Sequence, residues 1–310
     1  MILYFVNPNI QIVNSLKITI LSLIFLIHFT SSAQDRNNEF YISLFTGIIN
    51  YQGDLKPNSF TFNHSNFTAS LVLRKPITKW LSWRAGASIG RIEGADKYNR
   101  SYLKPRNLSF FSSIKEIYTA MEINLLDLST NRITPYAYGG LALFHFNPWT
   151  YDRNGNKVFL KQFSTEGQGL SQYPSRKPYG LTQLALPFGV GVKYALRNCM
   201  SISVEMSQRK TFTDYLDDVS SFYIDQNILL AERGQMAVNL AYRGDELPNG
   251  RSYPRDGTIR GTQSEMDWYY FFGISVEMKL SCLKELLSNS SRGSHLSYYQ
   301  THCPSVFSEY

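Results

Sequence analysis

The chain has 310 residues, of which 15% are aromatic and only 18% are charged, with a mean hydropathy of −0.24. Soluble domains carry roughly 25% charged residues, so this composition indicates a surface partly hidden from water, while the negative mean hydropathy excludes a bundle of transmembrane helices. The net charge is +7, but its basic residues are scattered, so we expect no nucleic-acid partner.

Residues 1–33 predict a signal peptide. Lys17 precedes an apolar run, Ile18–Phe29, which is followed by small residues up to Ala33. The run is too short to span a membrane as a helix, which needs about 20 residues. A basic residue, a short apolar core and small residues are typical of a secretory signal. We therefore expect cleavage after Ala33, with a signal anchor as the alternative.

Beyond the leader no helical period of useful length appears, and eight segments instead alternate apolar with polar residues. The clearest is Asp267–Leu280, where every second residue from Trp268 onward is apolar. Such a strand has one face suited to lipid and one polar face. The other segments are Glu39–Asn50, Asn66–Lys75, Trp80–Gly94, Ser109–Asp127, Ile133–Asn147, Leu181–Leu196 and Cys199–Ser207.

The connections between these segments alternate in length. Short turns are expected at Pro76–Lys79, Leu128–Arg132 and Arg197–Asn198, and long links at Tyr51–Ser65, Ala95–Leu108, Pro148–Gly180 and Thr211–Met266. Short periplasmic turns and long external loops are typical of bacterial outer-membrane barrels. Residues 34–282 therefore predict an all-β fold, an eight-stranded antiparallel up-and-down transmembrane barrel in the cell outer membrane. Both mature termini would be periplasmic.

The inward positions of this barrel are charged. We expect ion pairs among Arg84, Glu122, Lys193, Glu205 and Glu277, with Arg74, Lys279 and Glu116 also facing inward. A barrel of eight strands is just wide enough for its own side chains, so its interior should be plugged. Aromatic girdles at the lipid headgroups, or alternatively packing residues of a soluble core, are expected at Trp80, Trp83, Tyr136, Tyr138, Trp268, Tyr269 and Tyr270.

Catalytic and metal sites have little support in the sequence. The expected mature chain contains four histidines, His64, His145, His295 and His302, and no sequence pattern indicates a nucleophile and an orienting carboxylate beside one of them, so we predict neither an enzyme nor a cofactor. Asp214, Asp217 and Asp218 are weak candidates for binding a hard cation. Their spacing differs from that of a calcium loop, and the preferred interpretation is that Asp214 caps or turns the chain and the others join loop hydrogen bonds.

The three cysteines leave the disulfide state open. Cys199 and Cys282 lie at the same rim of neighbouring predicted strands, and an oxidising periplasm favours a bond between them. Strict alternation, however, places Cys199 on the inner face and Cys282 on the outer face. A bond between Cys282 and Cys303 is the alternative.

Three stretches resemble a family of outer-membrane β-barrels from the Bacteroidota. They are Thr211–Asp225, which contains the signature loop, Arg260–Phe271 at the approach to the final strand, and Phe40–Pro57. The family includes PorG, the barrel subunit of the type IX secretion system. The resemblance implies a non-enzymatic protein that anchors or assembles a periplasmic complex for protein transport. The signature-loop residues are Thr213, Asp214, Tyr215, Leu216, Asp217 and Asp218.

The expected partners are therefore outer-membrane lipid and the periplasmic secretion-ring proteins, a lipoprotein and its companion. Two other functions stay open: a surface binding module that uses its long external loops, or a narrow pore. Residues 283–310 are rich in Ser and Asn, which favours a disordered periplasmic tail. Within that tail, Leu283–Leu287 is too short to predict a docking helix.

Overall fold

The computed structural model describes residues 39–57, 61–128, 130–197 and 199–291. The expected signal peptide, residues 1–33, lies outside the described residues. So do residues 292–310, which include His295, His302 and Cys303.

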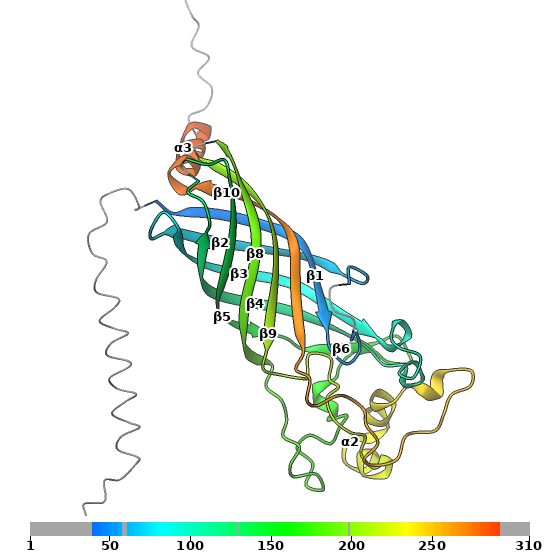
Figure 1. The fold of residues 1–310 in the computed structure, drawn as a ribbon. Helices are drawn as coiled ribbons and strands as arrows, with labels where there is room; N and C mark the ends of the chain where they lie inside the picture. The colour runs from blue at the N-terminus through cyan, green and yellow to red at the C-terminus, as the bar shows by residue number, and fades with distance from the viewer. Residues whose placement is uncertain (1–38, 58–60, 129, 198, 292–310) are drawn as a thin grey trace, which may run out of the picture. The chain divides into compact units, whose positions relative to one another are not determined.

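Eight long strands form a closed antiparallel barrel (Figure 1). Each strand pairs with the next along the wall, and the last pairs with the first from Tyr41↔Lys279 to Gln52↔Trp268. The predicted eight-stranded antiparallel barrel is therefore confirmed. Its strands are β1 (Tyr41–Gln52), β2 (Asn66–Pro76), β3 (Leu81–Ala95), β4 (Ser109–Asn124), β5 (Ile133–His145), β8 (Thr182–Arg197), β9 (Met200–Thr211) and β10 (Trp268–Lys279).

Alternation along each strand separates two chemistries. In β4, Glu116 is 2% exposed while its neighbour Ile117 is 61% exposed. Because successive side chains of a strand point to opposite faces, the wall carries an outer belt of aliphatic and aromatic side chains. Members of this belt with large exposure are Leu44, Phe67, Leu71, Ile89, Ile117, Leu141, Leu184, Val190, Val204 and Ile274. A continuous apolar surface of this kind suits lipid rather than water.

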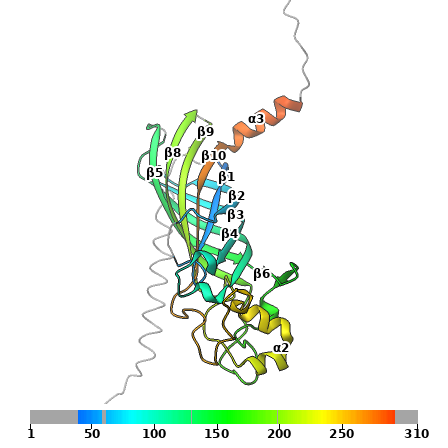
Figure 2. The ribbon, with the colours of Figure 1, turned by 90° about the vertical axis from the view of Figure 1, so that its right-hand side faces the viewer.

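The two ends of the barrel differ. The short connections β2–β3, β4–β5 and β8–β9 all lie at the end where the chain enters β1 and leaves β10, as the pairing of Tyr41 with Lys279 requires. The long connections lie at the opposite end, with α2 (Gln226–Ala241) among them (Figure 2). This is the predicted sorting of loops by length.

The expectation of a chain without helices is wrong for the Thr211–Met266 connection, which contains α2. Asp225 caps this helix, since its side chain accepts hydrogen bonds from the amides of Asn227 and Ile228. Gly234 has a φ of 79° within α2 and kinks it, so no sustained helical period is visible in the sequence. Among the described residues, no helix combines the length and apolar character needed to cross a membrane.

Further local structure extends the long-loop end. The Pro148–Gly180 connection contains a hairpin of β6 (Pro148–Tyr151) and β7 (Lys157–Phe159). β6 pairs with the first residues of β4, where Phe111 lies opposite Trp149. Short 3₁₀ turns lie at Asp96–Tyr98, Lys104–Arg106, Lys161–Phe163 and Gly244–Glu246. We call the part of the structure built by the connections at this end the cap.

The tail contains a second helix that the sequence interpretation missed. α3 (Leu280–Ser291) follows β10 directly, so residues 283–291 are helical and the expectation of disorder is wrong for them. Leucines recur at positions 280, 283, 286 and 287, and Leu, Lys and Glu are good helix formers. The composition of Ser and Asn that favoured disorder is concentrated after Leu287.

A disulfide joins Cys199 to Cys282, with the two Cα atoms 6.2 Å apart. The objection from strict alternation does not apply, because β9 begins at Met200 and β10 ends at Lys279, so that both cysteines lie outside the regular strands. The register of β8 and β9 also shifts between Ala195 and Arg197. The bond ties the first turn of α3 to the β8–β9 turn.

Thiol labelling tests this bond. In a Cys303→Ser variant of the purified protein, no thiol should react with a maleimide after denaturation without reductant, and two should react after reduction. A Cys199→Ser, Cys303→Ser double variant is the control and should expose one thiol without reductant. Two reactive thiols in the unreduced single variant would contradict the bond.

Candidate functional site

The barrel interior holds four cations and four carboxylates. Arg74 pairs with Glu277 at 2.7 Å, Lys193 with Glu122 at 2.8 Å, and Arg209 with Glu116 at 3.0 Å. Arg84 lies 3.0 Å from Glu205 and 3.4 Å from Glu122. Every one of these side chains is at most 8% exposed. Equal numbers of opposite charges thus fill the interior.

The interior contains Arg209 where the prediction placed Lys279. Arg209 was missed because the predicted strand stopped at Ser207, whereas β9 continues to Thr211. Lys279 was expected to face inward but is half-buried at the last position of β10. The predicted inward residues Arg84, Glu122, Lys193, Glu205 and Glu277 do lie together.

Three tyrosines expected in the aromatic girdles instead belong to the interior. Tyr136 and Tyr138 donate hydrogen bonds to Glu205 at 2.8 and 2.7 Å, and Tyr269 donates to Glu116 at 2.6 Å. Their strand positions fix this orientation, because each alternates with an outward neighbour. Trp80 is 55% exposed at the short-turn end. Tyr270 is buried and donates to the carbonyl of Thr61.

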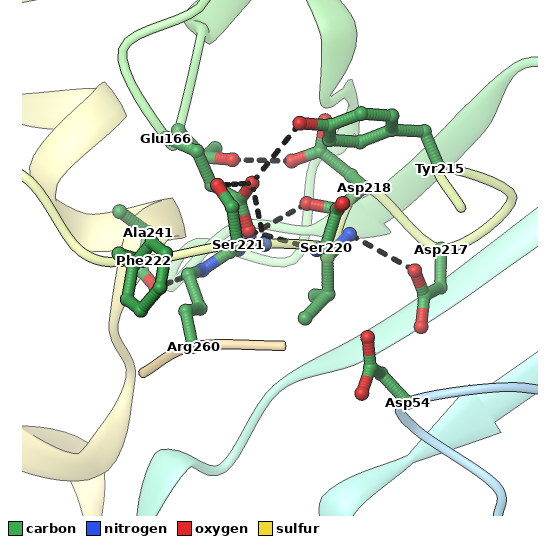
Figure 3. Close-up of polar contacts among 12 residues, drawn as sticks. Asp54, Glu166, Tyr215, Asp217, Asp218, Ser220, Ser221, Phe222, Ala241 and Arg260 are labelled. Atoms are coloured by element: carbon green, nitrogen blue, oxygen red, sulfur yellow. Dashed lines mark hydrogen bonds and ion pairs between the residues drawn. The ribbon is translucent and has the colours of Figure 1, made fainter. Parts of the chain in front are cut away.

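A second network lies in the cap and contains the signature loop (Figure 3). Its centre is Glu166, which is fully buried in the Pro148–Gly180 connection. Glu166 accepts hydrogen bonds from the amides of Ser220 and Ser221 at 2.9 and 3.0 Å, and from the Ser221 hydroxyl at 2.7 Å. It also forms an ion pair with Arg260 at 2.8 Å. One carboxylate therefore joins three segments that are far apart in the sequence.

Arginine side chains extend this network. Arg260 donates to the carbonyl of Asp218 at 2.6 Å and to that of Ala241, the last residue of α2, at 3.2 Å. Arg106 pairs with Asp96 at 2.6 Å and donates to the carbonyl of Arg260. Buried carbonyls and carboxylates are thereby supplied with donors, which is the condition for burying them at all.

Asp218 holds the signature loop against the β7–β8 connection. Its φ is +66°, a conformation that aspartate tolerates better than most residues. Its carboxylate accepts from Thr165 Oγ1 at 2.6 Å and from Tyr179 Oη at 2.7 Å. Burial raises the pKa of Asp218 to about 6, against the opposing effect of Arg260.

Asp217 and Asp214 have other surroundings. Asp217 accepts from Tyr51 Oη at 2.6 Å and from the amide of Val219 at 2.9 Å. Neither oxygen of Asp214 accepts a hydrogen bond of ordinary geometry from a described residue, so the expected capping is wrong, whereas the chain does bend at Asp214, as the alternative of a turn expects. Burial raises the pKa of Asp214 to about 9. Within the described part of the chain, no group of three or more His, Cys, Asp or Glu side chains could hold a metal ion.

The described histidines form no catalytic arrangement. His145 is exposed on β5 and contacts Thr182 Oγ1 at 3.0 Å. His64 stacks on Tyr98 with ring centroids 3.8 Å apart and lies 3.8 Å from Glu93. Both His64 and Glu93 border a cavity of about 480 Å³, which is walled by Tyr98, Phe110, Phe111 and Tyr151 and also lined by Lys56 and Lys97.

Replacing Glu166 by glutamine should loosen the cap while leaving the barrel closed. The side-chain NH₂ of glutamine would face the amides of Ser220 and Ser221 or the guanidinium of Arg260, which are donors as well. Losing a hydrogen bond at a buried site in this way costs about 1–3 kcal/mol. We expect faster proteolysis of the Thr211–Met266 connection, with unchanged heat-modifiable migration of the barrel. Glu232→Gln on the exposed face of α2 is the control; equal protease sensitivity of the two variants would contradict this role.

Comparison with known proteins gives a family. The sequence profile of the domain of unknown function DUF6089 matches residues 18–229, more than half of the chain. The chain belongs to this family. The DUF6089 match includes β1 to β9 and the signature loop, and it ends within α2. No curated protein matches the chain.

Solved structures similar to this DUF6089 protein include other barrels. They are Neisserial surface protein A (10% identity, TM-score 0.38, 78% of this chain and 97% of that chain), Ail of Yersinia pestis (7%, 0.37, 78% and 98%) and a major outer membrane protein of Thermus thermophilus (12%, 0.39, 78% and 98%). Likenesses of this size carry no inference about function.

Proposed function

We propose that this DUF6089 protein is a non-enzymatic outer-membrane barrel that anchors or assembles a periplasmic complex. The observation that carries the proposal is an interior filled with buried ion pairs inside an apolar belt. Four ion pairs and their tyrosine partners fill the cross-section, while aliphatic side chains cover the outside. An apolar belt of this kind is stable in lipid, and a filled interior of eight strands supports an anchor rather than a channel.

The belt supports outer-membrane lipid as the first partner. A closed barrel satisfies all backbone donors and acceptors of the wall without water, as hydrocarbon requires. Bacterial barrels place their short turns in the periplasm, which puts both ends of the barrel segment and α3 on that side. The cap then faces the exterior.

The periplasmic end supports a docking role. α3 leaves the wall at this end and the Cys199–Cys282 bond fixes its first turn, while Leu286 and Leu287 are 59% and 64% exposed. The type IX assignment rests on the resemblance of Thr211–Asp225, Arg260–Phe271 and Phe40–Pro57 to the Bacteroidota family that includes PorG. The partners would be the ring lipoprotein and its companion.

Two measurements test this function. Affinity purification of the full chain from outer membranes should recover periplasmic ring proteins, and a Leu286→Glu, Leu287→Glu variant should recover fewer. Charged substitution of the exposed Leu230 on α2 is the control for the cap end. Recovery of no ring protein by the wild type would defeat the secretion role. Channel conductance in planar bilayers would defeat the filled interior.

A surface binding module is the second candidate. Two observations favour it. The cavity beside Tyr98 lies at the cap end, and the cap has a hydrophobic core of its own. This core consists of Leu170, Ile224, Leu229, Ala237, Val238 and Ala241. Replacing residues 226–241 by a short flexible linker separates the two functions. Secretion should survive if the periplasmic end does the work, and it should fail if the cap does.

A further inference from the structure

The hydroxyl of Tyr51 lies between two buried carboxyl groups. Its oxygen is 2.6 Å from Asp217 Oδ2 and 3.0 Å from Asp267 Oδ1, and none of the three residues is more than 1% exposed. A phenol hydroxyl carries one hydrogen, so Tyr51 can donate to only one of these oxygens. The other contact is a hydrogen bond only if that carboxyl group carries a proton.

The remaining partners decide which carboxyl group is protonated. Asp217 accepts from the amides of Val219 at 2.9 Å and Leu55 at 3.3 Å as well as from Tyr51, so both of its oxygens face donors. Asp267 Oδ2 accepts from the amide of Leu216 at 2.8 Å. Among the described residues, Asp267 Oδ1 has the tyrosine hydroxyl as its hydrogen-bond partner. The proton therefore belongs on Asp267 Oδ1.

The surroundings favour this uncharged form. The negative charge of Asp54 lies near both Asp217 and Asp267, and that of Asp214 lies near Asp267. Figure 3 shows the carboxylate of Asp54 facing that of Asp217. Glu166 adds negative charge near Asp214. Arg106 is the cation whose charge reaches Asp217, but it pairs directly with Asp96. Burial first, and then the neighbouring negative charges, raise the pKa of Asp267 well above its ordinary value.

The same contacts join the cap to the barrel wall. Tyr51 belongs to the end of β1, Asp217 to the signature loop, and Asp267 directly precedes β10. The packing around them is tight, since a Cβ atom at Gly53 would lie 1.9 Å from Asp267 Oδ1. Thr211 Oγ1, at the end of β9, donates to the carbonyl of Asp267 at 2.6 Å. Three strand ends therefore meet at this point.

We propose that a proton closes the cap on the barrel: Asp267 donates it to Tyr51, and Tyr51 donates its own to Asp217. The chain of hydrogen bonds, which we call the proton latch, breaks when Asp267 loses its proton, because Tyr51 then faces two carboxylates. The latch is independent of the proposed secretion role.

The direction of the pH effect follows from proton binding. The closed cap holds a proton that the open cap releases once the pH exceeds the ordinary carboxyl pKa of about 4. From there up to the raised pKa of the closed state, the equilibrium constant for opening increases about tenfold per pH unit for each proton held. The latch is therefore tightest in acid and loosens as the pH rises.

Matched amide variants test the latch in the full-length protein in lipid vesicles. Asp267→Asn supplies a permanent donor to Tyr51 and keeps an acceptor for the Leu216 amide. Asp217→Asn instead places the NH₂ of asparagine against Tyr51 Oη or the Val219 amide, which are themselves donors. We expect the ratio of cap proteolysis in the wild type to that in Asp267→Asn to rise about tenfold per pH unit across the titration window. Asp217→Asn should be cleaved faster than either at every pH.

Infrared spectroscopy of the wild type supplies a readout that does not depend on any variant. A buried protonated carboxyl band should persist at neutral pH in the closed protein, and Asp267→Asn should lose part of it. Absence of that band from the wild type would overturn the latch, whether or not the variants fold. So would parallel pH profiles for the wild type and Asp267→Asn.

Discussion

Replacing Glu205 by leucine is expected to destabilise the barrel by about 3–5 kcal/mol, the cost of removing one partner from a buried ion pair. Glu205 accepts from Arg84, Tyr136 and Tyr138 at 3.0, 2.8 and 2.7 Å. Leucine would leave two buried hydroxyls without their acceptor. Arg84 would keep its hydrogen bond to Tyr118 Oη at 3.0 Å and its longer contact with the Glu122 carboxylate at 3.4 Å.

Urea unfolding of the protein in lipid vesicles measures this effect. The control is Asp245→Asn, which removes one partner of an ion pair whose side chains are 42% and 48% exposed; such pairs contribute at most about 1 kcal/mol. Glu205→Gln should fall between the two, because an amide oxygen in the place of Oε2 can still accept from Arg84 and Tyr136. Equal unfolding free energies for the leucine variant and the exposed control would contradict a structural role for the interior network.

Placing arginine at Val190 is expected to cost about 2–4 kcal/mol, the penalty for a basic residue on the lipid face near the bilayer midplane. Val190 lies in the middle of β8 and is 60% exposed on the outer face of the wall. In a water-soluble barrel the same substitution would be nearly neutral. The free energy of unfolding from vesicles therefore tests the membrane assignment itself.

The control for Val190→Arg is Leu230→Arg on α2, where the side chain is 41% exposed in the cap. Surface substitutions of this kind usually change stability by no more than about 0.5 kcal/mol. A similar small change at both positions would show that the belt does not contact hydrocarbon. A large loss at Val190 alone would support insertion in the membrane.

The interior network stabilises the barrel, and the proton latch holds the cap on it. Within the wall, carboxylates face arginine, lysine and tyrosine donors, and their charges are balanced. At the junction with the cap, Asp54, Asp214, Asp217 and Asp267 outnumber the cations that reach them. Changes of pH should consequently act on the cap before they act on the barrel.

Much of the barrel could be predicted from the chain because its determinants are local. Alternation along a strand, as at Glu116 and Ile117, assigns each side chain to the lumen or to the outer face without knowledge of any neighbour. The lengths of the connections show which end of the barrel carries the short turns and which carries the long loops, again without knowledge of the tertiary structure. Arg209, Tyr136 and Tyr138 were misassigned only because a strand boundary or an orientation was placed incorrectly.

The sequence by itself determined where the strands lie, the apolar outside and the charged inside, because a period of two residues can be read from consecutive positions. Only the tertiary structure decided the partners: Glu166 with Arg260, Tyr51 with Asp217 and Asp267, and Cys199 with Cys282. These residues are separated by tens to hundreds of positions, and no local pattern encodes which buried donor meets which acceptor. Their pairing follows from barrel closure, which brings the ends of distant strands together and excludes water from between them.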